Sequence, residues 1–115
     1  MRNPELLLLV DDDVNNLKIL SSLLKREYRI KVARGGREAL RLAEEDPIPD
    51  LILLDVMMPE MDGYTVCERL KSNSRTQDIP VIFLTGKTQA EDETRGFQAG
   101  AVDYVTKPIN PPVLW

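Results

Sequence analysis

Carboxylates directly follow two apolar runs in this chain. The triplet Asp11–Asp13 comes after a run of five apolar residues, and Asp55 comes after a run of four. Two unit charges about 4 Å apart repel by roughly 1 kcal/mol in water and by about 4 kcal/mol at the effective dielectric near a protein surface. Such a cluster either stays solvated or gathers around a compensating cation.

The donor types favour magnesium. Mg²⁺ prefers oxygen ligands and is held by few carboxylates, several waters and an oxygen of a substrate phosphate. Asp11 and Asp12 after one apolar run, together with Asp55 after another, fit this requirement. The alternative for Asp11 and Asp12 is a solvated acidic loop that caps a helix. For Asp13 we favour that structural role, as the start of a helix.

A calcium-binding loop of the EF-hand type is excluded by the residues at two of its positions. Asp11, Asp13 and Asn15 stand at the first three ligand positions of such a loop. However, the sixth position holds Asn16 instead of glycine, and the twelfth holds Ser22 instead of glutamate.

Three residues could carry out phosphoryl transfer. A carboxylate such as Asp55 that attacks a phosphoryl group forms an acyl phosphate. Lys107 could neutralise the phosphoryl oxygens, and Thr85 could donate its hydroxyl to one of them. The structural alternatives are a simple cap at Asp55, a solvated lysine at 107 and a β-branched strand residue at 85.

Composition limits the class of protein. The chain has 115 residues, which suits one domain, and its net charge of -4 gives no basic footprint for nucleic acid. The absence of histidine excludes a Ser-His-Asp triad, a Cys-His dyad and a His-ligated zinc. A single cysteine, Cys67, suits a reducing compartment, and no run is long enough to span a membrane. We therefore expect a cytoplasmic protein.

Apolar runs of strand length alternate with helical patterns. This order predicts right-handed βαβ units and a mainly parallel sheet with helices on both faces. In such sheets ligands bind beyond the carboxyl ends of the strands, where the acids, Thr85 and Lys107 are expected to meet. The predicted strands are 6–10, 29–33, 51–54, 81–84 and 102–106. The predicted helices are 14 to about 27, one around 39–43, about 64–71 capped by Asp62, and 90–99.

The segments "LLLLVDDDVNNLKIL", "PDLILLDVMMPEMDGYTVCERLK", "IPVIFLTGKT" and "AGAVDYVTKPI" stand in the order and spacing of a known family. Over essentially residues 1–115 the chain resembles a bacterial two-component response-regulator receiver (CheY-like) domain. The resemblance implies an α/β fold: a doubly wound, five-stranded parallel sheet, flavodoxin-like, with strand order 2-1-3-4-5.

The resemblance also implies the site. Asp55 would accept a phosphoryl group. Mg²⁺, with Mn²⁺ as an alternative, would bind Asp12 directly, Asp11 through water, one oxygen of Asp55 and the backbone carbonyl of Met57. No organic cofactor is implied.

The same resemblance implies a switch. Thr85 and Lys107 would contact the phosphoryl group, with a cis Lys107–Pro108 bond aiming the lysine inward. Thr85 would then move toward the phosphoryl group, and Tyr104 would rotate into the vacated space. Tyr104 could equally be a packing residue.

The function implied is a phosphoacceptor switch that takes its phosphoryl group from a sensor histidine kinase or a phosphotransfer protein. Such a domain catalyses only its own phosphorylation and dephosphorylation. The expected partners are the kinase, an output domain C-terminal to this segment and a second copy bound through the helix 4–strand 5 region. Neither nucleic acid nor membrane is expected to bind this segment directly.

Two other classes of protein use similar residues. An aspartyl phosphatase resembling haloacid dehalogenases needs a second acid two residues after the nucleophile, where this chain has Met57. A pseudo-receiver that only dimerises usually lacks the acids or the lysine, which this chain keeps.

The "KPINPPVLW" ending resembles receivers joined to domains that make or cleave cyclic di-GMP, or to kinases. Because the chain ends where a fifth helix should begin, we expect a truncated receiver domain whose apolar face is uncovered.

Overall fold

The computed structural model describes residues 5–85 and 103–106. Five parallel strands form one sheet in the order β2-β1-β3-β4-β5. This confirms the predicted fold class and strand order. The elements are β1 (Leu6–Val10), α1 (Val14–Leu24), β2 (Arg29–Ala33), α2 (Gly36–Glu44), β3 (Leu51–Asp55), α3 (Gly63–Lys71), β4 (Val81–Thr85) and β5 (Asp103–Thr106).

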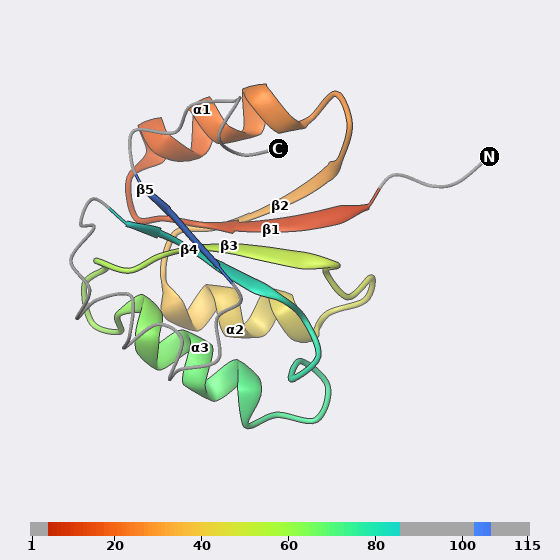
Figure 1. The fold of residues 1–115 in the computed structure, drawn as a ribbon, viewed down its shortest axis with the longest axis vertical. Coiled ribbons are helices and arrows are strands. Elements are labelled where there is room, and N and C mark those ends of the chain that lie inside the picture. Colours follow the sequence, from red (N-terminus) through yellow and green to blue (C-terminus); the bar gives the residue numbers. More distant parts are fainter. Residues whose placement is uncertain (1–4, 86–102, 107–115) are drawn as a thin grey trace.

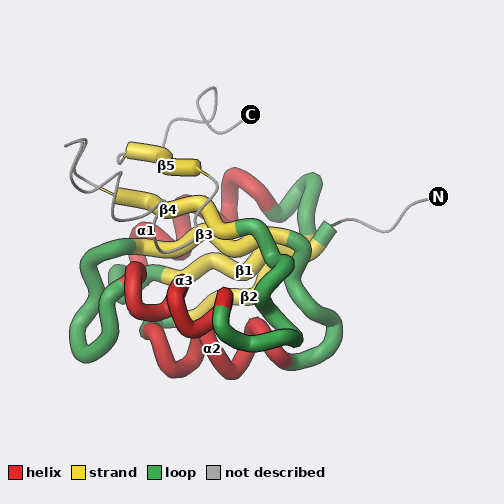
Figure 2. Tube along the Cα trace, turned by 60° about the horizontal axis from the view of Figure 1, so that its bottom comes forward, coloured by secondary structure: helices red, strands yellow, loops and turns green. Residues whose placement is uncertain are grey.

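The sheet is the middle layer of the molecule. Helix α1 covers one face, and α2 and α3 cover the other, as Figure 1 and the turned view in Figure 2 both show. Successive side chains of a strand point to opposite faces. In β1, Leu7 and Leu9 therefore pack under α1, whereas Leu8 and Val10 pack under α2 and α3. Since both faces are covered, the whole strand is apolar and buried.

The predicted boundaries hold closely at the strands and less closely at one helix. β3 and β4 each include one more residue than predicted, Asp55 and Thr85. Helix α1 ends at Leu24 and not near Glu27. The N–H groups of Glu27 and Tyr28 both donate to the carbonyl of Leu24, so a tight turn leads into β2. The amphipathic pattern alone did not reveal this turn.

Several predictions fall outside the described residues. These are the helix over 90–99, the first residue of the predicted strand 102–106, Lys107 with its cis bond to Pro108, and the truncated fifth helix. Within the described residues no helix is long and apolar enough to cross a membrane.

Lys31 ties the edge strand β2 to the end of α2. Its ammonium group donates to the carbonyl oxygens of Leu42, Glu45 and Pro47 at 3.2, 2.9 and 2.9 Å. The last carbonyls of a helix have no partner within the helix, and a cation there also opposes the negative end of the helix dipole. One side chain thus satisfies three acceptors near the end of α2.

We expect Lys31→Met to lower the free energy of unfolding by about 2 kcal/mol, within the range that hydrogen bonds to a charged group contribute. Urea unfolding followed by circular dichroism measures this loss. Lys18→Met is the matched control, because Lys18 is exposed on α1. Equal midpoints for the two variants would contradict this role of Lys31.

Candidate functional site

The strand register brings the predicted residues to one edge of the sheet. Val10 of β1 pairs with Leu54 of β3, so Asp11 and Asp55 follow at the same level. Asp55 in turn pairs with Leu84 of β4, and Thr85 is the next residue. Parallel strands end at a common edge, which is why residues far apart in sequence meet here.

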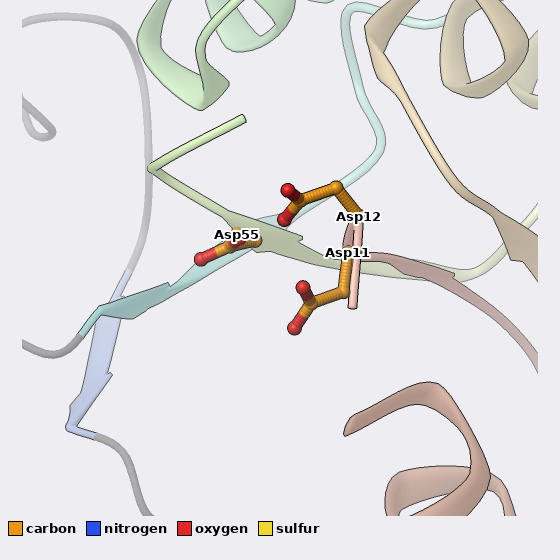
Figure 3. Close-up of side chains that lie close together, drawn as sticks. All are labelled: Asp11, Asp12 and Asp55. Carbon is orange, nitrogen blue, oxygen red and sulfur yellow. The ribbon is translucent and has the colours of Figure 1, made fainter. Parts of the chain in front are cut away.

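Three carboxylates gather at this edge. One oxygen each from Asp11, Asp12 and Asp55 lies within 4.8 Å of the others. Figure 3 shows the first two at the end of β1 and the third at the end of β3. Asp11 and Asp55 are only 1% and 4% exposed, whereas Asp12 is exposed. Burying two like charges beside a third is costly unless another group neutralises them.

The donor set fits a hard divalent cation. All three groups supply carboxylate oxygens, which Mg²⁺ prefers, and they contain no softer sulfur or imidazole donor. The exposed position of Asp12 leaves one side of the cluster accessible to solvent, where Mg²⁺ would keep waters or accept a phosphate oxygen. The residues present are therefore compatible with the predicted magnesium site.

The carboxylate of Asp11 is held on both oxygens. Its Oδ1 accepts the backbone N–H of Asp13 at 3.0 Å, and its Oδ2 accepts the side-chain amide of Asn16 at 3.2 Å. Asp13 is the N-cap of α1, and its side chain accepts the N–H of Asn15 at 2.8 Å. The structure confirms the capping role predicted for Asp13. Sequence reasoning missed the contact of Asn16 with Asp11.

Gly63 fixes the approach of α3 to the end of β3. Its N–H donates to the carbonyl of Val56 at 2.8 Å. A β-carbon at this position would overlap the carbonyl oxygen of Asp55 and would lie 2.9 Å from the α-carbon of Val56. Only glycine, which has no β-carbon, lets α3 come this close to the backbone of Asp55 and Val56. As predicted, Asp62 is the N-cap of α3. Its side chain accepts the N–H of Thr65 at 2.9 Å.

The remaining predicted residues are only partly described. Thr85 ends β4, and Tyr104 lies in β5 opposite Phe83 of β4. The side chains of Thr85 and Tyr104 lie outside the described part of the structure, as does all of Lys107. Met57 is 66% exposed, and its carbonyl stays a predicted ligand.

Cys67 is not a candidate nucleophile. It lies in α3 within the core shared with α2 and the sheet. Burial raises the pKa of its thiol to about 11, with a smaller contribution from Glu68 and an opposing one from Lys71. The thiolate is the reactive form of cysteine, so this group stays inert near neutral pH.

Comparison with known proteins agrees with the fold and shows the family. The sequence profile of the response regulator receiver domain matches residues 7–115. The chain is 53% identical over 108 residues to a probable cyclic di-GMP phosphodiesterase of Vibrio cholerae, covering 94% of this chain and 24% of that protein. It is 44% identical over 110 residues to the response regulator PleD of Caulobacter vibrioides, covering 95% and 24%. The chain thus spans about a quarter of the length of these relatives.

Solved structures show the same architecture. The chemotaxis protein CheY4 of Vibrio cholerae superposes with a TM-score of 0.91 at 32% identity, over 97% of this chain and 93% of that one. The BeF3-activated DrrB receiver domain gives a TM-score of 0.86 at 38% identity, covering 97% and 92%. The chain belongs to the response regulator receiver domain family of two-component signalling, and its fold is CheY-like.

Gly63→Ala should destabilise the protein by roughly 2 kcal/mol, because the added methyl group must displace the backbone of β3 beside Asp55. Gly35→Ala is the matched control, since beyond its chain neighbours nothing lies within 4 Å of the added β-carbon. We expect that control to change the free energy of unfolding by less than about 1 kcal/mol. Urea titration of both variants measures the difference, and similar losses would contradict the steric account.

Proposed function

We propose that this domain is a phosphorylation switch whose phosphoacceptor is Asp55. The observation that carries the proposal is the meeting of Asp55 with Asp11 and Asp12 at the carboxyl edge of the sheet. Family membership supports it, because receiver domains are the signal-receiving parts of two-component systems. The domain would catalyse its own phosphorylation and dephosphorylation and no other reaction.

The proposed reaction is an in-line displacement at phosphorus. A carboxylate oxygen of Asp55 forms a bond to the phosphorus of a phosphohistidine, and the bond from phosphorus to the imidazole nitrogen breaks. The electron pair of that bond stays with the leaving imidazole, which takes up a proton. Asp55 is held rigidly for this attack, because it is the last residue of β3 and is 4% exposed.

Asp11, Asp12, Asp55 and the carbonyl of Met57 would hold Mg²⁺, with Mn²⁺ as the alternative ion. When bound, the ion neutralises charge on the phosphoryl oxygens and on the carboxylates. The oxygen-only donor set and the proximity of the three acids support this assignment. Lys107 would neutralise another phosphoryl oxygen, since it directly follows Thr106, the strand partner of Thr85.

The phosphoryl group would change the partner surface of the domain. Thr85 would donate its hydroxyl to a phosphoryl oxygen, and Tyr104 would follow by rotating inward. Strand pairing supports this coupling, because Thr85 and Tyr104 lie on adjacent strands β4 and β5.

A histidine kinase or phosphotransfer protein would supply the phosphoryl group. A second copy would dock on the region formed by the predicted helix over 90–99 and β5.

An output domain would lie C-terminal to this segment. The relatives described above are about four times longer than the matched region, and one is a probable cyclic di-GMP phosphodiesterase. The proposed output is therefore a domain that acts on cyclic di-GMP.

Incubation of the chain with acetyl phosphate and Mg²⁺ should add one phosphoryl group to its intact mass. The gain should be absent in Asp55→Asn, which lacks the nucleophile, and absent when EDTA removes the ion. Asp50→Asn is the matched control, because Asp50 lies at the opposite end of β3. No gain in the folded wild-type chain would favour the pseudo-receiver alternative, a module that only dimerises.

A further inference from the structure

We propose that Asn16 is a positioning residue for the cation site, acting through Asp11. The inference rests on the proposed function, since it concerns how that site is prepared for its ion. Asn16 lies in the first turn of α1, half-buried, and its amide nitrogen donates to Oδ2 of Asp11 at 3.2 Å.

The hydrogen bonds at the start of α1 differ from the usual capping pattern. In a capping box, the side chain three residues after the N-cap accepts the backbone N–H of the N-cap residue. Here Asp13 is the N-cap and Asn16 holds that third position. The N–H of Asp13 donates to Oδ1 of Asp11 instead. The amide of Asn16 is therefore not needed for capping and donates to the metal-site carboxylate.

The two donors fix the plane of the Asp11 carboxylate. Oδ1 accepts the backbone N–H of Asp13, and Oδ2 accepts the side-chain amide of Asn16. Rotation of the carboxylate about its last side-chain bond would break both bonds at once. A carboxylate held in this way is oriented before a cation arrives, so less ordering is required when the ion binds.

The bond from Asn16 also has an electrostatic effect. Asp11 is 1% exposed and lies beside two other carboxylates, so few waters can solvate its charge. The amide donor partly replaces those waters without adding a positive charge that would repel a divalent cation. An uncharged donor at this position therefore supports the anionic cluster and leaves its attraction for the ion in place.

Asn16→Leu keeps a similar side-chain size but removes the donor. Partners that orient metal ligands typically contribute at least tenfold to metal affinity, so we expect the dissociation constant for Mn²⁺ to rise about tenfold. Electron paramagnetic resonance of free Mn²⁺ measures it without any phosphorylation step. Asn15→Leu is the matched control, because Asn15 is the neighbouring residue and its side chain is exposed. Asn16→Ala is a second variant in case leucine disturbs the helix.

A second readout separates positioning from chemistry. With acetyl phosphate, Asn16→Leu should need about tenfold more Mg²⁺ for half its maximal phosphorylation rate and should recover a near wild-type rate at saturation. Combining Asn16→Leu with Asp11→Asn should weaken Mn²⁺ binding no further than Asp11→Asn alone, because the interaction partner is already changed.

The outcomes distinguish this inference from the proposed function. If wild type binds Mn²⁺ and is phosphorylated while Asn16→Leu and Asn16→Ala match it, the inference is wrong and the proposed function stands. An equal loss in Asn15→Leu would also overturn it. If wild type neither binds Mn²⁺ nor accepts a phosphoryl group, the proposed function fails and the inference fails with it.

Discussion

The crowding of three carboxylates at one edge of a parallel sheet is the constraint on which the rest of the structure depends. Asp11 and Asp55 are buried, and oxygens of both lie within 4.8 Å of one from Asp12. In the sequence, like charges directly follow a buried strand. In the structure, a carboxylate from a second strand lies beside them, which increases the repulsion. The proposed divalent cation would neutralise these charges and so offset the electrostatic cost of the arrangement.

Three rigid features of the fold keep these carboxylates close together. Strand β1 is buried along its whole length, so its end cannot shift away from β3. Gly63 lets α3 pack directly against the backbone of Asp55. Helix α1 begins at the cluster, and its first turn supplies donors to Asp11 from Asp13 and Asn16. Rigid surroundings thus preorganise the acids, as the proposed phosphoryl transfer would require.

The alternation of apolar runs and helical patterns predicted the parallel sheet and the meeting of the three acids at its edge, and residue type at the helix starts predicted the caps at Asp13 and Asp62. The order of the strands came from the family resemblance. Neither predicted the contact of Asn16 with Asp11, which depends on side-chain conformation within a helical turn. The close packing that requires glycine at position 63 also depends on tertiary structure and was not predicted. The early end of α1 reflects the tight turn into β2, which competes with helical periodicity.

The most direct test of the central claim is thermal unfolding of wild type and Asp55→Asn, each in EDTA and in excess Mg²⁺. In EDTA the variant should melt at a higher temperature, because removing one charge relieves the repulsion in the cluster. Mg²⁺ should raise the midpoint of wild type more than that of the variant, because an ion that binds only the folded state stabilises it. A wild-type midpoint unaffected by Mg²⁺, together with a less stable variant in EDTA, would contradict the claim that these acids are gathered for a cation.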